Sequence, residues 1–221
     1  MKIITLIIFG ALCLGMDIVY TIFNKTKGYK AVLIKGLTIM ASFILAVICT
    51  NFNSVTGALP IFIFIGLAFC LLSEAMSVST VDEEKPKMIV FGLLKSVAIA
   101  LFAVSALTLS GFNLFALGGG LLIGLGIGCI ICAIKKYKKA YQLFSTVIVW
   151  TAVGFLLFEG VYACLTSVRF IASVMMVAAG VLIALSQLVQ AFAKEGGKMQ
   201  YVSSIMYTLA LTVLALLIYF Y

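Results

Sequence analysis

Apolar residues form eight long stretches along this chain, and short polar segments separate them. Each stretch holds about the 20 residues that a helix needs to cross the hydrocarbon core of a bilayer. The pattern therefore predicts an all-α protein, a polytopic membrane bundle of eight transmembrane helices that forms a single domain over residues 1–221. The expected spans are residues 3–23, 31–50, 58–81, 88–109, 112–134, 142–166, 170–193 and 201–221.

The composition excludes most other classes of protein. Apolar types make up 65% of the residues and charged types 10%, whereas a soluble domain has about half apolar and a quarter charged residues. A soluble globular domain, a disordered chain and a nucleic-acid-binding domain are therefore excluded. The chain has no His, which removes every His-based general base, triad or metal site. No metal ion or organic cofactor is expected.

The positive charges predict the orientation in the membrane. Eleven Lys residues lie in four alternate loops between the expected spans, and the other side carries only Lys2 and Arg169. Because positive residues favour the cytoplasmic side, these odd-numbered loops are expected inside and both termini outside. We expect an integral multi-pass protein of a bacterial plasma membrane. The eleven are Lys25, Lys27, Lys30, Lys85, Lys87, Lys135, Lys136, Lys138, Lys139, Lys194 and Lys198.

Four charged residues lie inside the expected spans at a similar depth. Asp17, Lys35, Glu74 and Lys95 belong to the first four spans and lie about 6–11 Å from the cytoplasmic boundary at 1.5 Å per residue. Charged residues inside a membrane are costly, and they commonly mark a functional site. The pattern predicts a polar cluster that faces the bundle interior.

Simpler interpretations remain open for some of these charges. Asp17 and Lys35 flank one short hairpin and can form a purely structural pair, and Lys35 can extend its ammonium group to the cytoplasmic surface. Glu159 lies in the outer half of the sixth span, where Arg169 is a candidate neighbour. Glu74 is the strongest functional candidate, because it follows Ser73 within an apolar run.

The fifth span contains three glycines at a spacing of four residues, Gly120, Gly124 and Gly128. Such a stripe lets another helix approach closely. We favour packing within the monomer, and a dimer through this stripe is the alternative.

Residues 66–74 and 179–187 resemble each other. Both begin with small residues, continue with an apolar run and end in Ser followed by an acidic or amide residue, Glu74 or Gln187. The two segments lie 113 positions and four helices apart. An even number of helices keeps their directions the same, so the similarity predicts two parallel four-helix repeats.

At these positions the chain resembles the YhhN-type lysoplasmalogenase family of eight-span membrane proteins. The family pattern of the third helix, Gly-x-x-Phe-x-x-x-Gly/Ser-Asp, is matched by Gly66, Phe69, Ser73 and Glu74. The pattern of the seventh helix is matched loosely by Ala179, Gly180, Ser186 and Gln187. Lys35 matches a Lys at the start of the second helix, and Tyr207 and Ala210 match part of the last helix.

The resemblance implies hydrolysis of the vinyl ether bond of a lysoplasmalogen, with a fatty aldehyde and a glycerophospho-base as products. This reaction needs an acid that protonates the alkenyl carbon and a base that directs water. The resemblance implies Glu74 as the principal acid or base, Gln187 as its polar partner and Asp17 as a possible second carboxylate. It implies a lysophospholipid or other lipid as ligand, contacted by Lys35, Lys95, Ser73, Ser186 and Tyr207.

The chain departs from the family at two points that bear on catalysis. Glu74 and Gln187 stand where the family has two acidic residues, and the family's His in the fourth helix is absent. An amide cannot exchange a proton at neutral pH, so Gln187 can only orient water or the headgroup. Two other functions therefore remain open, a non-catalytic lipid-binding relative and a small secondary transporter.

Overall fold

A computed structural model describes residues 2–23, 29–53, 56–78, 85–137, 139–193 and 198–221, and these ranges consist of α-helices with short non-helical connections. Each helix begins and ends within three residues of the expected span. The helices are α1 (Lys2–Phe23), α2 (Tyr29–Asn53), α3 (Ala58–Val78), α4 (Lys85–Ser110), α5 (Leu114–Lys135), α6 (Ala140–Thr166), α7 (Phe170–Phe192) and α8 (Lys198–Phe220).

Six helices are long and apolar enough to cross a membrane over the residues that the structure describes, where the sequence predicted eight. They are α3 to α8, and α2 contributes a shorter apolar stretch, Gly36–Phe52. The chain is therefore a helical multi-pass membrane protein by the length and composition of its helices.

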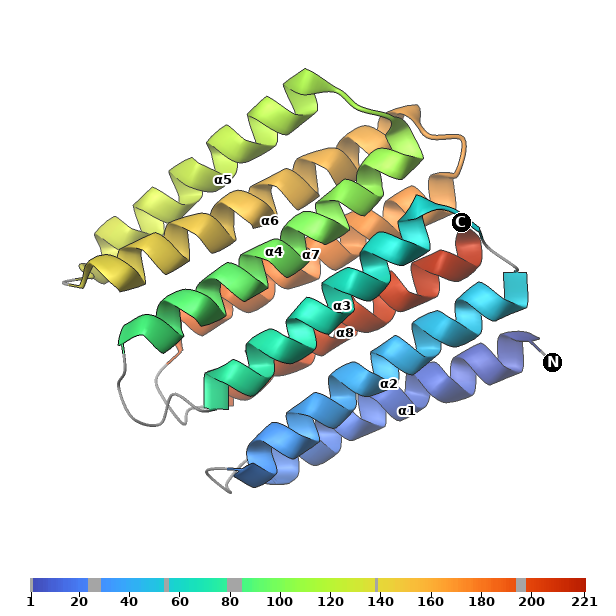
Figure 1. Cartoon of the computed structure of the whole chain (residues 1–221), viewed down its shortest axis with the longest axis horizontal. Coiled ribbons are helices and arrows are strands. Elements are labelled where there is room, and N and C mark those ends of the chain that lie inside the picture. The colour runs from blue at the N-terminus through green and yellow to red at the C-terminus, as the bar shows by residue number, and fades with distance from the viewer. Residues whose placement is uncertain (1, 24–28, 54–55, 79–84, 138, 194–197) are drawn as a thin grey trace.

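Successive helices run in opposite directions, so their ends gather at two ends of the bundle (Figure 1). The carboxyl ends of α1, α3, α5 and α7 lie at one end, together with the amino ends of α2, α4, α6 and α8. Both chain termini lie at the opposite end (Figure 1). Lys135 and Lys139, which flank the connection between α5 and α6, therefore lie at the end away from the termini.

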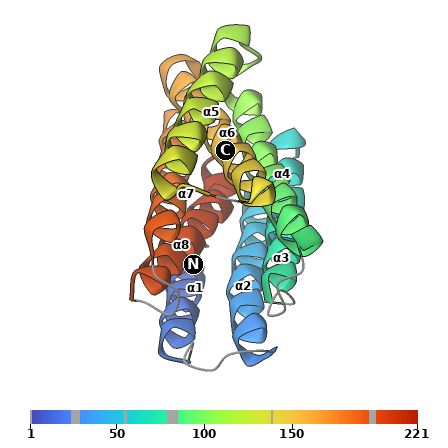
Figure 2. The ribbon, with the colours of Figure 1, turned by 90° about the vertical axis from the view of Figure 1, so that its left-hand side faces the viewer.

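The packing contacts are largely the same for the first four helices and the last four. Exchanging α1 with α5, α2 with α6, α3 with α7 and α4 with α8 leaves most of the contacting pairs unchanged. Beyond the hairpins of neighbouring helices, α4 packs against α6 and α8 packs against α2, while the smaller contacts α4–α7 and α8–α3 also match. Figures 1 and 2 place α1 and α5 at opposite edges of the bundle. The pattern departs from this exchange where α1 packs against α8 as well as α2.

The glycine stripe of α5 packs against α6 within the monomer. Gly120, Gly124 and Gly128 are all buried. A Cβ atom on Gly124 would lie 2.8 Å from the Cα atom of Thr151, and one on Gly120 would lie 2.9 Å from the carbonyl oxygen of Gly154. Because these distances are shorter than ordinary contacts, only glycine lets the two backbones approach this closely.

The first turn of α5 explains why this helix begins at Leu114 rather than at residue 112. Asn113 is the N-cap, and its side-chain oxygen accepts hydrogen bonds from the backbone N–H groups of Phe115 and Ala116 at 2.8 and 3.3 Å. These bonds satisfy donors that have no partner inside the helix. The apolar pattern alone does not reveal this boundary, because Phe112 continues it.

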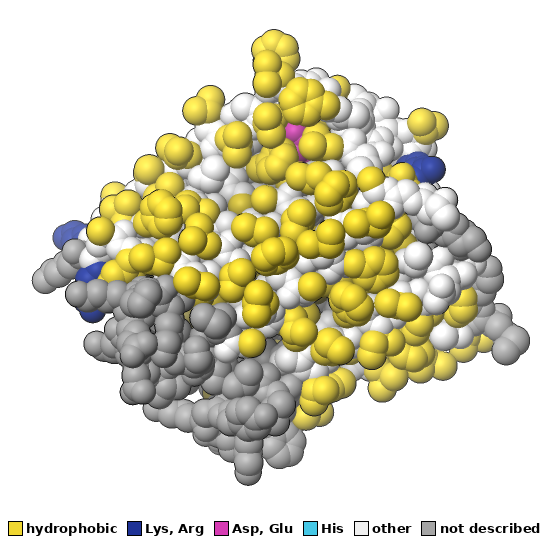
Figure 3. All heavy atoms as spheres, in the orientation of Figure 1, with side chains coloured by type: hydrophobic (Ala, Val, Ile, Leu, Met, Phe, Trp, Pro, Cys, Tyr) yellow, Lys and Arg dark blue, Asp and Glu magenta, His cyan; other side chains and the backbone are white. Residues whose placement is uncertain are grey.

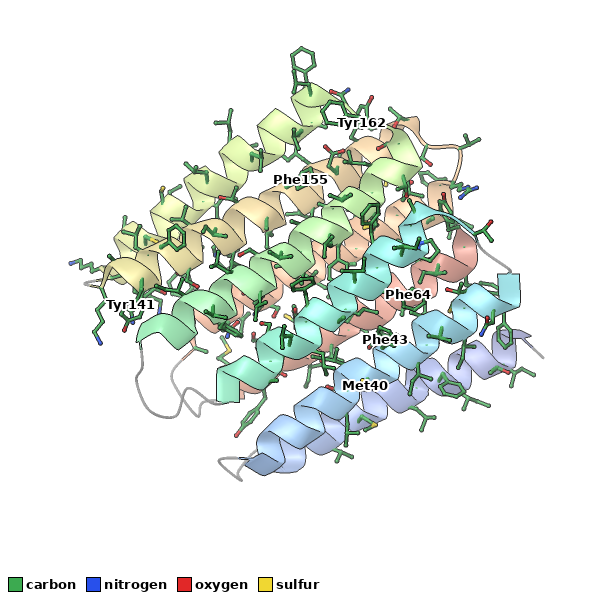
Figure 4. The ribbon with its side chains drawn as sticks, viewed as in Figure 1. Met40, Phe43, Phe64, Tyr141, Phe155 and Tyr162 are labelled. Atoms are coloured by element: carbon green, nitrogen blue, oxygen red, sulfur yellow. The ribbon has the colours of Figure 1, made fainter. Side chains whose placement is uncertain are left out.

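The surface is apolar over the middle of the bundle and charged at its ends. Figure 3 shows hydrophobic side chains over most of the described part of one face, with Lys and Arg side chains near the two ends. Aromatic residues fill part of the interior between α2 and α3, where the rings of Phe43 and Phe64 lie 5.3 Å apart (Figure 4). An exposed apolar belt of this kind suits contact with lipid acyl chains.

Candidate functional site

Six of the eight predicted site residues are buried inside the bundle. Ser73 and Glu74 come from α3, Lys95 from α4, and each is exposed by no more than 4%. The other three, Ser186, Gln187 and Tyr207 from α7 and α8, are also buried. Four helices therefore bring these polar groups into the interior, as expected for Glu74 and Lys95.

The side chains of Asp17 and Lys35 lie outside the described residues. Their positions in the sequence place them on α1 and α2. Their roles as a second carboxylate and a headgroup ligand stay predictions.

Tyr207 connects the charged residues of this cluster. Its hydroxyl group lies 3.1 Å from the Sγ atom of Cys70 on α3, within hydrogen-bonding distance. The Nζ atom of Lys95 lies 4.8 Å from the centre of the Tyr207 ring, close enough for a cation–π interaction. Glu74 is near enough to act electrostatically on both Tyr207 and Cys70. Tyr207 therefore joins α3, α4 and α8 around one buried ammonium group.

A polar cavity of about 200 Å³ opens beside this cluster, between α4, α6 and α7. Lys95 and Gln187 line it, so the structure brings together two residues that the sequence placed in the site. Ser145 and Thr146 add hydroxyl groups from α6. The remaining lining residues are Phe91, Tyr137, Val149, Trp150, Gln190 and Ala191.

Lys95 presents its ammonium group to this cavity between amide and aromatic groups. Nζ donates a hydrogen bond of 3.3 Å to the Oε1 atom of Gln190. The ring of Phe91, one turn earlier on α4, lies 5.5 Å from Nζ. One amide oxygen and two aromatic rings are thus among the groups that contact this cation. The ammonium group places a positively charged donor on the cavity wall.

Two further polar atoms of the site are buried without a hydrogen-bond partner among the described residues. They are the Nε2 atom of Gln187 and the Oγ atom of Ser73. Since a buried donor without a partner costs about 1–3 kcal/mol, such atoms usually serve a ligand or water. Gln187 lines the same cavity as Lys95, so both offer donors to a ligand with oxygen acceptors.

Ser186 is engaged in helix packing. Its hydroxyl donates to the carbonyl oxygen of Ser203 on α8 at 2.8 Å, and the Ser203 hydroxyl donates to the carbonyl oxygen of Ser186 at 2.9 Å. This reciprocal pair joins α7 to α8 beside Gln187. The geometry gives Ser186 a role in fixing the position of Gln187 relative to α8.

Glu74 lies close to the cluster but is not among the described residues that line the cavity. Glu74 acts electrostatically on Tyr207, whereas Gln187 lines the cavity together with Lys95. The pairing of Glu74 with Gln187 stays a prediction. Gly66, about two turns earlier on α3, packs against the ring of Phe102, where an added Cβ would lie 2.8 Å from Cδ1. This contact sets the close approach of α3 and α4.

The structure adds six polar or aromatic residues that the sequence analysis missed: Phe91, Tyr137, Ser145, Thr146, Trp150 and Gln190. Gln187 and Gln190 are three residues apart, so they share a helix face, and an amide pair in an apolar helix is a usable signal. Ser145, Thr146 and Trp150 carry no comparable signal, because single hydroxyl and aromatic groups occur throughout membrane helices.

Among the residues described, no group of three or more Cys, Asp or Glu side chains is placed to hold a metal ion. The chemistry that the site offers is one buried ammonium, amide and hydroxyl donors, a tyrosine and a nearby carboxyl. No family model, curated protein or solved structure matches the chain.

Proposed function

We propose that the protein binds a lysophospholipid in the cavity between α4, α6 and α7 and hydrolyses its vinyl ether bond, as the resemblance to lysoplasmalogenases implies. The observation that carries the proposal is the pair of donors, the Lys95 ammonium and the unpartnered Gln187 amide, on one polar cavity inside an apolar bundle. A phosphate group supplies oxygen acceptors and negative charge for both. The acyl or alkenyl chain then lies among the apolar helices.

The carboxyl of Glu74 supplies the acid of the proposed reaction. It protonates the alkenyl carbon that is not bonded to oxygen, which leaves an oxocarbenium ion on the carbon that is. Water adds to that carbon and returns a proton to the Glu74 carboxylate, and the hemiacetal that results breaks down to a fatty aldehyde and the free glycerol hydroxyl. Gln187 orients the headgroup or the water in this scheme, because its amide cannot transfer a proton.

We propose further that all eight helices cross the membrane, with both termini outside, and that the bundle consists of two parallel four-helix repeats. The contact between α4 and α6 corresponds to the contact between α8 and α2 when the two halves are exchanged, which supports the repeat. The grouping of the helix ends around Lys135 and Lys139 at one end supports the orientation (Figure 1). A dimer through the α5 stripe is not favoured, because α6 already covers it.

The experiment is a coupled aldehyde assay with purified protein and lysoplasmalogen. Glu74→Gln should abolish the release of aldehyde, because general acid–base catalysis typically contributes about 10²–10⁴-fold. Gln187→Asp should raise it, since it restores the second acidic position of the family. Ser42→Ala is the control: it removes a buried hydroxyl on α2 that lies 3.4 Å from Thr212, and activity should persist.

Other outcomes favour the other two functions. If no variant releases aldehyde but lysophospholipid changes the fluorescence of Trp150, the chain's single Trp and a residue of the cavity wall, the protein binds lipid without cleaving it. If proteoliposomes show substrate flux instead, the parallel repeats and buried charges belong to a transporter. Full activity in Glu74→Gln would exclude Glu74 as the acid.

A further inference from the structure

A second buried carboxyl, Glu159 on α6, lies apart from the cavity and takes no part in the proposed reaction. Its side chain is fully buried, with 0% of its surface exposed. Neither carboxyl oxygen has a hydrogen-bond partner among the described residues. Figure 4 labels Phe155 and Tyr162, which lie about one turn before and one turn after Glu159 on the same helix.

The helices packed against α6 offer Glu159 no charged or titratable neighbour. α6 packs against α4, α5 and α7. Their segments 96–110, 114–128 and 170–186 contain no acidic, basic, Cys or Tyr residue. On α6 itself the nearest such residues are Tyr162 and Cys164.

Arg169, the candidate partner from the sequence, is engaged elsewhere. It is exposed, and its guanidinium carbon lies 3.8 Å from the centre of the Tyr221 ring. The expected proximity of Glu159 and Arg169 therefore gives no hydrogen bond to either carboxyl oxygen. The guanidinium group stacks on Tyr221, directly after the end of α8, and leaves Glu159 in an apolar interior.

An ionised carboxylate in such surroundings is costly, because it has lost its hydration and gained neither a cation nor a donor. The neutral acid carries no charge and avoids this cost. We propose that Glu159 is a proton-binding site, at which the bundle holds one proton as a neutral carboxylic acid.

This site is separate from the lipid cavity and goes beyond the proposed function. Trp150, in the cavity wall, precedes Glu159 by nine residues, which is about 13 Å along the helix. Val153 and Leu156 lie between them and are buried. Glu159 lies seven residues from the end of α6 at Thr166, so it belongs to the half of the bundle that carries the termini.

The test is an infrared difference spectrum at neutral pH between the full-length protein and E159Q. Glutamine has nearly the same shape and no charge, so the variant should fold and isolate this one carboxyl. The wild type should show the C=O stretch of a protonated carboxyl, which E159Q lacks and E159D retains at a shifted frequency. If the difference contains only the bands of an ionised carboxylate, the proposal is wrong.

Carbodiimide labelling gives a second measurement that does not depend on recovering the variant. Dicyclohexylcarbodiimide reacts with protonated carboxyls in apolar surroundings, and mass spectrometry of the peptides locates the adduct. We expect an adduct on the peptide that contains Glu159. Absence of this adduct, under conditions where the reagent labels a known buried acid in a control protein, would overturn the proposal. Neither measurement depends on lipid cleavage, so the two proposals fail independently.

Discussion

Lys95 is the residue on which ligand binding at the cavity depends most directly. Its ammonium group contacts Gln190 and the rings of Phe91 and Tyr207, and Lys95 lines the cavity. Lys95→Gln should weaken lysophospholipid binding about 10- to 100-fold, because hydrogen bonds to charged groups contribute about 1.5–3 kcal/mol. Titration of Trp150 fluorescence measures the affinity.

The matched control for this change is Lys136→Gln. Lys136 is an exposed lysine at the same end of the bundle and is not among the lining residues described for the cavity. Its removal alters the surface charge equally but should leave the affinity nearly unchanged. Equal losses in both variants would show that general surface charge, rather than the Lys95 ammonium, attracts the lipid.

Tyr207 allows the roles of a hydroxyl group and a ring to be separated. Tyr207→Phe removes the hydroxyl contact with Cys70 and keeps the ring under Lys95. We expect a loss of about 1 kcal/mol in the free energy of unfolding and little change in lipid affinity. Tyr207→Leu also removes the ring and should reduce the affinity, because the cation–π contact is lost. Unfolding in detergent and Trp150 fluorescence separate the two effects.

The sequence revealed part of the site because charges and amides are rare in membrane spans. Glu74, Lys95 and Gln187 stand out against apolar neighbours, and all three are buried in the bundle. That Glu74 is not among the lining residues of the cavity was not predictable, because depth along a helix does not fix the direction in which a side chain points. The rotation of the helix and its packing partners decide that direction. One neighbour of Glu74 is Tyr207, which lies on a helix distant in sequence.

At the scale of elements, the contact between α5 and α6 depends on glycines that face each other. Gly124→Ala should destabilise the protein by about 1–3 kcal/mol, because the new Cβ atom meets the backbone of Thr151, which cannot move aside as a side chain could. Gly126→Ala is the control: nothing lies within 4 Å of a Cβ at this position. It should leave stability unchanged or raise it by up to about 1 kcal/mol through helix propensity.

Thermal unfolding of the two alanine variants in one detergent measures this difference. If Gly124→Ala is as stable as Gly126→Ala, the two helices are not held at the distance that the structure shows.

The sequence predicted the stripe and favoured packing within the monomer, which the structure shows. It did not identify the partner helix, because the matching glycine on α6, Gly154, stands alone without a repeated spacing.

At the scale of the whole molecule, the sequence predicted the eight helices closely because apolar runs and polar breaks alternate at the width of a membrane. Its boundaries failed where local chemistry decides, as at the Asn113 cap of α5. The helix order in space was not predictable from the runs. Only the similarity of residues 66–74 and 179–187 indicated a repeated arrangement of helices. The matching contacts α4–α6 and α8–α2 agree with that prediction.

The orientation of the whole bundle gives the last prediction. Lysine-rich connections at the end opposite the termini should face the cytoplasm, because the positive-inside bias there is eleven charges against two. A reporter that is active only in the cytoplasm should therefore give no signal when fused after Tyr221. The same reporter fused to a chain shortened after Lys136, between α5 and α6, should give a strong one.

A strong signal from Tyr221 and none from Lys136 would reverse the orientation, and it would place the Lys95 cavity on the outer side and Glu159 on the cytoplasmic side. Equal signals from both would instead mean that one or all three of α6, α7 and α8, the helices between the two fusion points, fail to cross.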